Sequence, residues 1–140
     1  MQELNSLLEA VSGFVKECPF LNDIDLHVDQ VDEEPQSYAV TTVGLAKLSE
    51  DILGGQTWQY NATLQSREYT ADDLSRLNAS KFTERFVFWT ADRSRSGQLP
   101  ELPSGFEAVS VSADNGMLLA LDDDGDRGIY QVQLHLIFKR

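Results

Sequence analysis

Apolar and polar positions alternate with two different periods along the chain, and the change of period separates helices from strands. Near the start, apolar residues recur every three to four positions, which predicts an amphipathic helix over residues 3–17 that stops before Pro19. The same spacing returns after Thr70, a favourable N-cap residue, and predicts a helix over residues 71–94, with a kink or break at Asn78 as the alternative to a continuous helix. The two apolar stripes are Leu4, Leu7, Leu8, Val11, Phe14 and Val15, and then Leu74, Leu77, Phe82, Phe86 and Trp89.

Strict alternation of apolar and polar residues predicts strands between and after these helices. Residues 24–28 and 38–43 flank the polar turn at 32–35, and we expect them to form an antiparallel hairpin. Residues 44–56 are less regular, with a flexible joint at Gly54-Gly55. A long strand then covers residues 57–67, in which Trp58, Tyr60 and Leu64 share a face.

The last third of the chain is again β-structure. We expect a strand over residues 106–111, a turn at 114–116, a return strand over 117–121 and an acidic turn at 122–126. The final strand is the clearest, because Tyr130, Val132, Leu134, Leu136 and Phe138 alternate with residues that are mostly polar. Together these elements predict one α+β domain over residues 1–140. Its mostly antiparallel or mixed sheet has about five to six strands and packs against two main helices, at 3–17 and 71–94.

The charge of the chain argues against a nucleic-acid-binding protein. The formal net charge is −12, and a protein that grips phosphate backbones needs a basic footprint instead. Two interpretations stay open: the charge keeps the protein soluble, or part of it faces DNA that must slide past without binding. No apolar run reaches the ~18 residues of a membrane helix, and the first residues lack the basic start of a secretory signal.

A search for chemistry predicts no catalytic, cofactor or metal site. His27 and His135 lie on the polar faces of strands, and Cys18, the single cysteine, follows Glu17 at a helix C-terminus, a setting that disfavours a thiolate. A lone cysteine cannot form an internal disulfide and suits a reducing cytoplasm. The spacing of the aspartates at 122, 124 and 126 resembles the start of a calcium loop, but Arg127 stands where that loop requires glycine.

Several short motifs follow one another in order along nearly the whole chain. This order and spacing resemble the phage and prophage minor capsid protein family of Gram-positive bacteria, whose members look like tail terminator proteins of long-tailed phages. The chain departs from that pattern in its acidic run at 122–126 and in its strong overall acidity. The motifs are Phe20-Leu21, Pro35-x-x-Tyr38, Gly54-Gly55-x-x-x-Gln59-Tyr60, Arg67-Glu68-Tyr69, the helical set Asn78, Phe82, Phe86 and Trp89, Leu99-Pro100-x-Leu102, and Tyr130-Gln131-Val132-Gln133-x-x-Leu136-Ile137-Phe138.

The resemblance implies a structural protein of the virion and no enzyme. Such terminators assemble in the host bacterial cytoplasm into a ring, usually a hexamer, that caps the tail tube at the head–tail junction. The ring contacts the tail tube protein and the head-completion protein, while DNA passes through its channel without specific binding. On this view the interface candidates are Gly54, Gly55, Trp58, Arg67, Arg93, Arg95, Leu99, Pro100, Asp122, Asp123 and Asp124.

Two other functions stay open at this point. A head-completion or stopper protein is also a small α+β ring protein, and its partners on the portal side distinguish it from a terminator. A small enzyme with a scattered site would instead show a deep pocket with convergent polar groups.

Overall fold

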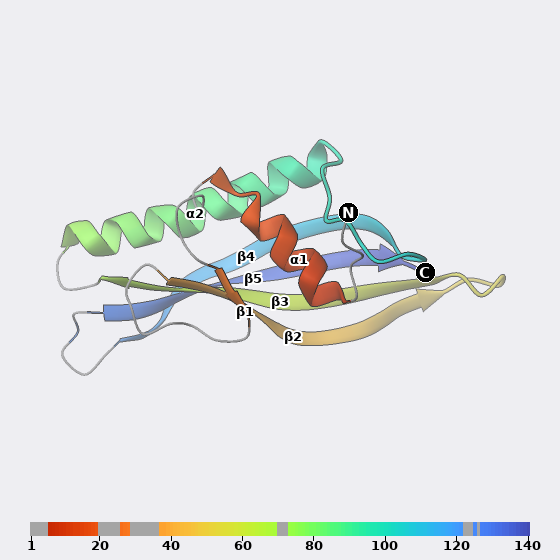
Figure 1. Ribbon diagram of the computed structural model, residues 1–140, viewed down its shortest axis with the longest axis horizontal. Helices are drawn as coiled ribbons and strands as arrows, with labels where there is room; N and C mark the ends of the chain where they lie inside the picture. Colours follow the sequence, from red (N-terminus) through yellow and green to blue (C-terminus); the bar gives the residue numbers. More distant parts are fainter. Residues whose placement is uncertain (1–5, 20–25, 29–36, 70–72, 122–124, 126) are drawn as a thin grey trace.

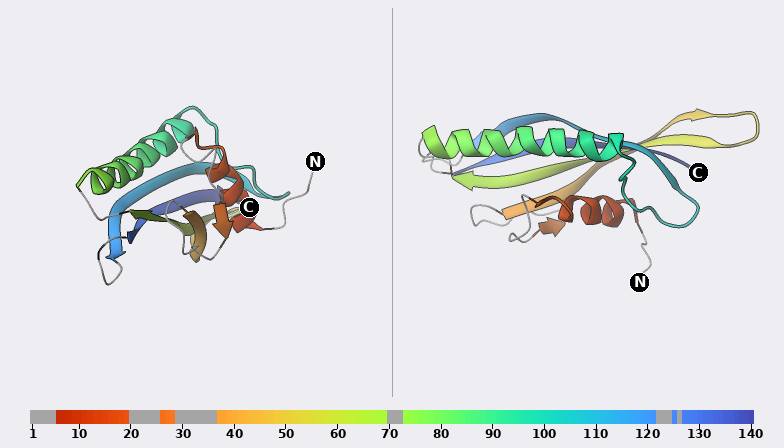
Figure 2. Two further views of the ribbon diagram at one scale, coloured as in Figure 1. Left: turned by 60° about the vertical axis from the view of Figure 1, so that its left-hand side comes forward. Right: turned by 90° about the horizontal axis from the view of Figure 1, so that it is seen from above.

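The computed structural model describes residues 6–19, 26–28, 37–69, 73–121, 125 and 127–140. In these residues two helices cover one face of a five-stranded sheet, which confirms the predicted α+β class and leaves the other face of the sheet open (Figures 1 and 2). The elements are α1 (Leu7–Lys16), β1 (Leu26–Val28), β2 (Ser37–Glu50), β3 (Gln56–Tyr69), α2 (Asp73–Arg95), β4 (Glu107–Leu121) and β5 (Arg127–Lys139).

The strands lie in the order β1-β2-β3-β5-β4, and every neighbouring pair is antiparallel except β1 with β2. The predicted antiparallel hairpin at the start of the sheet is therefore wrong, because Leu26 pairs with Tyr38 and Val28 with Val40 in parallel register. Alternation reports which face a side chain occupies and not the direction of the strand.

Strand β2 continues to Glu50 through the region that the sequence predicts to be irregular. Its pairing with β3 shifts register between Thr42 and Gly44 and again between Lys47 and Ser49, so Val43 and Leu48 are extra residues in β-bulges. Each bulge moves the following side chains to the opposite phase of the alternation. The period of two is lost along the sequence while the strand itself continues.

Strand β4 corrects a second expectation. The predicted turn at residues 114–116 lies inside one strand, whose pairing with β5 is irregular between Asp114 and Met117. Asn115 takes a left-handed conformation (φ 55°), as a bulge residue can. The sheet therefore has five strands and not six.

The core lies between the two helices and the covered face of the sheet. Val11, Phe14 and Val15 of α1 are buried there, and Phe86 of α2 is fully buried. Every second residue of β5 from Tyr130 to Phe138 is buried, which confirms the predicted face of that strand. Cys18 is also buried in this core.

The ends of the helices follow ordinary capping chemistry. Helix α1 begins at Leu7, later than predicted, because the Ser6 side chain accepts a hydrogen bond from the backbone N–H of Glu9. Helix α2 runs without interruption through Asn78 and ends where Gly97 adopts a φ of 78°. The N–H of Gln98 then donates to the carbonyl of Arg93, a typical C-terminal cap. The predicted N-cap Thr70 lies outside the described residues.

Candidate functional site: the open face of the sheet

The centre of the open sheet face, on β3 and β5, is lined mostly by polar side chains without fixed charge. The outward residues of β3 pair across the sheet with those of β5, so that four neighbouring pairs form its centre. None of these eight residues is Asp, Glu, Lys or Arg, although the chain carries a net charge of −12. The pairs are Gln59 with Ile137, Asn61 with His135, Thr63 with Gln133, and Gln65 with Gln131.

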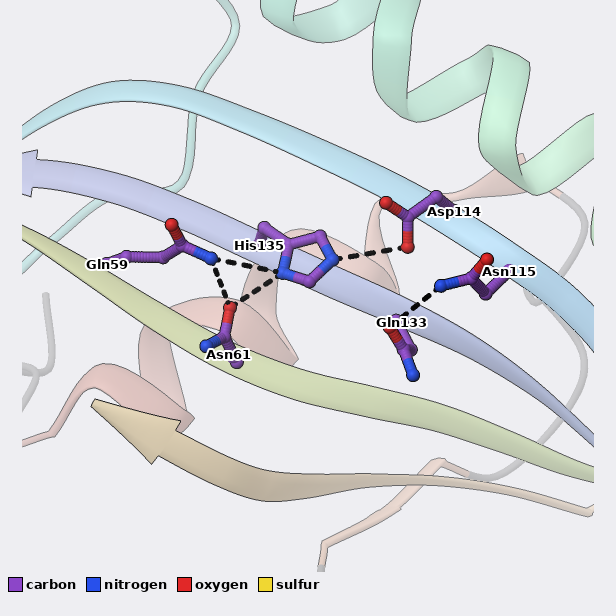
Figure 3. Close-up of polar contacts among 6 residues, drawn as sticks. All are labelled: Gln59, Asn61, Asp114, Asn115, Gln133 and His135. Carbon is purple, nitrogen blue, oxygen red and sulfur yellow. Dashed lines mark hydrogen bonds and ion pairs between the residues drawn. The ribbon is translucent and has the colours of Figure 1, made fainter. Parts of the chain in front are cut away.

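His135 is the centre of a hydrogen-bonded row on this face (Figure 3). Its Nδ1 lies 2.6 Å from Oδ1 of Asn61 and 3.4 Å from the amide nitrogen of Gln59, which in turn donates to Asn61 at 2.8 Å. Its Nε2 lies 3.2 Å from Oδ1 of Asp114 on the neighbouring strand β4. The imidazole therefore connects three strands and is held from both sides.

Two further contacts extend the row along the sheet. The Gln65 amide donates to Gln131 at 3.1 Å, and the Asn115 amide donates to Gln133 at 3.0 Å. Because these side chains hold one another, the centre of the face is a fixed array made mostly of amide groups. Figure 3 draws the part of this array around His135. Amides donate and accept hydrogen bonds without attracting or repelling phosphate by charge.

The array offers little of what catalysis or metal binding requires. The ring nitrogens of His135 contact the Asn61 and Gln59 amides and the Asp114 carboxylate, and among the described residues no Ser, Thr or Cys side chain hydrogen-bonds to them. Within the described part of the chain, no cluster of three or more His, Cys, Asp or Glu residues could hold a metal ion. A widely open hollow of about 480 Å³ lies beside the β2–β3 turn. Its lining mixes the carboxylates of Asp51 and Glu107 with the cations of Lys139 and Arg140.

The interface candidates drawn from the sequence do not form one surface. Gly54 and Gly55 lie in the β2–β3 turn, and Arg95 is exposed at the end of α2. Leu99 packs against the core and Pro100 is buried, so the loop after α2 lies partly inside the protein. The remaining candidates are Trp58, which packs against the core, Arg67 in β3, Arg93 near the end of α2, and Asp122, Asp123 and Asp124, which lie outside the described residues.

Arg93 has a role within the chain. Its guanidinium forms an ion pair with Glu17 after α1 and lies 5.3 Å from the ring centres of both Phe14 and Trp89. The side chain is 22% exposed. These contacts tie the C-terminal end of α2 to α1, so Arg93 stabilises the helix layer.

The sequence did not predict a second surface, which consists of exposed apolar side chains. Some lie on the β2–β3 hairpin, where Ile52 and Leu53 are almost completely exposed. Others lie on α2, where Phe88 is 67% exposed, and on β4, which carries Met117 and Leu118. The sequence Ile52-Leu53-Gly54-Gly55 is typical of a turn with two apolar residues at its tip. The hairpin was not predicted because the bulges in β2 interrupt the alternation before this turn.

Comparisons with known proteins gave no match for this chain. No protein-family model matches the chain, and no curated protein matches its sequence. Among the helices that the structure describes, none is long and apolar enough to cross a membrane.

Proposed function

We propose that this protein is a structural component of a phage virion, a tail terminator that forms a ring, caps the tail tube and joins it to the head. The observation that carries the proposal is the centre of the open sheet face, where a fixed array of mostly amide side chains holds a single carboxylate, Asp114, on a strongly acidic protein. The sequence resemblance to the minor capsid protein family supplies the biological setting. Assembly then takes place in the host cytoplasm, and the ring stays at the head–tail junction.

A channel that DNA crosses must neither bind its phosphates tightly nor repel them. Duplex DNA binds proteins mainly through its phosphates, so a channel lined with lysine or arginine would hold it. A wall of carboxylates would repel it over a Debye length of ~8 Å. An amide wall avoids both effects, which suits a channel that DNA must cross in either direction. We therefore assign the open face to the channel, in place of the acidic lining expected from net charge alone.

The edges of the sheet also favour assembly. Strand β1 pairs with residues 38–40 only, so among the described residues the rest of β2 has one unpaired edge, and β4 forms the other edge of the sheet. Three register shifts interrupt the pairing of β4 with β5, and such irregularities discourage indiscriminate pairing of an edge strand. A neighbour must therefore match a particular shape, as a closed ring requires.

The first test is light scattering of the purified protein alone and with the cognate tail tube protein. We expect either a ring in isolation or a monomer that caps the tubes and fixes their length on mixing. Binding to portal-side proteins without any effect on tube length would indicate a head-completion or stopper protein instead. A monomer that binds neither partner would refute both virion functions.

A further inference from the structure

We propose that the hydrogen-bonded row around His135 is a proton-sensitive switch on the open sheet face. Protonation of the ring sets the direction of the hydrogen bonds that join His135, Asn61 and Gln59, and it offsets the charge of Asp114. Histidine is the side chain whose charge ordinarily changes between pH 5 and 8. The switch is a property of the single chain, and only its effect on DNA rests on the proposed function.

The structure shows the arrangement that suits the protonated ring (Figure 3). The amide nitrogen of Gln59 donates to Oδ1 of Asn61 at 2.8 Å, and the same oxygen lies 2.6 Å from Nδ1 of His135. An amide oxygen only accepts hydrogen bonds, so Nδ1 carries a proton in this arrangement. Nε2 lies 3.2 Å from Oδ1 of Asp114, an ionised carboxylate that also only accepts. Both ring nitrogens therefore face acceptors, and only the imidazolium has two N–H groups.

A neutral ring requires a different arrangement of the same side chains. It has one N–H group, which is held at Nε2, because the other tautomer would set a lone pair against the Asp114 carboxylate. Nδ1 then becomes an acceptor. Half-turns of two side-chain amides satisfy it, since Nδ2 of Asn61 can donate both to Nδ1 and to Oε1 of Gln59. The row thus has two complete hydrogen-bond arrangements, which differ by one proton and by the direction of the amides.

The surroundings of the ring leave Asp114 as the charge that the proton offsets. The His135 side chain is 23% exposed, so water reaches it, and that of Asp114 is 54% exposed. Among the described residues, Asp114 supplies the one charged contact of the ring. Protonation therefore changes this part of the face from one net negative charge to none. The other neighbours of the ring on β3, β4 and β5 are uncharged: Gln59, Asn61, Ser112, Gln133 and Ile137.

In the proposed ring, this change is repeated in every subunit. Each subunit then loses one net negative charge from the channel wall as pH falls, so the wall repels phosphates less. We expect the assembled wild type to bind duplex DNA at least ~3-fold more tightly at about pH 5.5 than at about pH 8. His135→Gln should remove this difference, because glutamine does not titrate.

The test of the switch itself is ¹⁵N NMR of the histidine rings, which distinguishes the imidazolium from each neutral tautomer. We expect His135 to be an imidazolium at about pH 5.5 and an Nε2–H tautomer at about pH 8. The side-chain amide signals of Asn61 and Gln59 should shift together with the ring. His135→Gln should abolish the pH response of both amides. The matched control is His27→Gln, at the other histidine of the chain, which should preserve it.

Several results would overturn the inference. They are a ring that stays neutral at about pH 5.5, an Nδ1–H tautomer at about pH 8, or amide signals that do not follow the ring. The proposed function is judged separately, by tube capping and by the DNA measurement. Coupled titration of ring and amides without any change in DNA affinity would keep the switch and contradict the channel assignment. Tube capping by a protein whose amides ignore pH would refute the switch and leave the function standing.

Discussion

At the scale of single residues, neighbouring aromatic side chains on α2 have opposite roles. Trp89 lies 5.0 Å from the ring centre of Phe14 and 5.7 Å from that of Phe86, whereas Phe88 is 67% exposed. We expect Trp89→Ala to lower the free energy of unfolding by about 3 kcal/mol, because it removes both ring contacts and leaves a cavity. Phe88→Ala is the matched control and should change it by less than ~0.5 kcal/mol. Urea titrations that give equal midpoints for the two variants would contradict this assignment.

Gly116 supplies a second prediction at this scale. A methyl group at this position would lie 2.9 Å from Cβ of Thr83, so Gly116→Ala must push β4 away from α2. Overpacking of this kind costs about 1–3 kcal/mol. Gly44→Ala is the control, because an added Cβ there meets nothing within 4 Å. Thermal melting should show a lower Tm for the first variant and an unchanged or higher Tm for the second; the opposite order would refute the close approach.

At the scale of elements, Arg93 joins the two helices, and its contacts depend on the planar guanidinium. Arg93→Lys keeps the charge opposite Glu17 but loses the stacking on Phe14 and Trp89. We expect a loss of about 1–2 kcal/mol in the free energy of unfolding. Arg95→Lys, at the exposed end of the same helix, serves as the control. Equal denaturation midpoints for the two lysine variants would show that Arg93 contributes only its charge.

The helices and strands also show which structural features could be predicted from the sequence. The described part of the α2 stripe, at Phe82, Phe86 and Trp89, and the alternation of β5 predicted their core-facing sides correctly, because each keeps a single period. Strands β2 and β4 were predicted poorly because bulges at Val43, Leu48 and residues 115–116 break the period without ending the strand. The parallel direction of β1 could not be predicted, since periodicity carries no information on direction.

The open face was only half predictable for a related reason. Alternation placed Asn61, Gln133 and His135 on polar faces of their strands. Their contacts depend on the register between β3, β5 and β4, which brings together residues 61, 135 and 114. This arrangement does not follow from the spacing of residues along the chain.

At the scale of the whole molecule, the protein is acidic while the centre of its open sheet face carries little charge. This difference predicts how added lysines would change the affinity for DNA. Gln131→Lys/Gln133→Lys places two cations per subunit on the open face, where a ring would concentrate them around its channel. We expect the assembled variant to bind duplex DNA at least ~10-fold more tightly than the wild type at low salt, and less so as salt rises. Fluorescence anisotropy with labelled duplex measures this affinity.

The control for that experiment adds the same charge elsewhere. Ser96→Lys/Gln98→Lys places two lysines at exposed positions after α2, away from the sheet. If the open face lines the channel, this variant should bind DNA much more weakly than the sheet variant. Equal affinities would mean that only net charge matters, and that the open face has no special relation to DNA.

The central claim is that copies of this chain form a ring whose channel is lined by the open sheet face. Electron microscopy of tail tubes capped with the purified protein tests it most directly, because the reconstruction shows which face of each subunit points toward the axis. The account predicts a closed ring at the tube end with Gln65, Gln131, Gln133 and His135 facing the channel and both helices outside. A ring with the helices lining the channel, or tube ends without a ring, would contradict it.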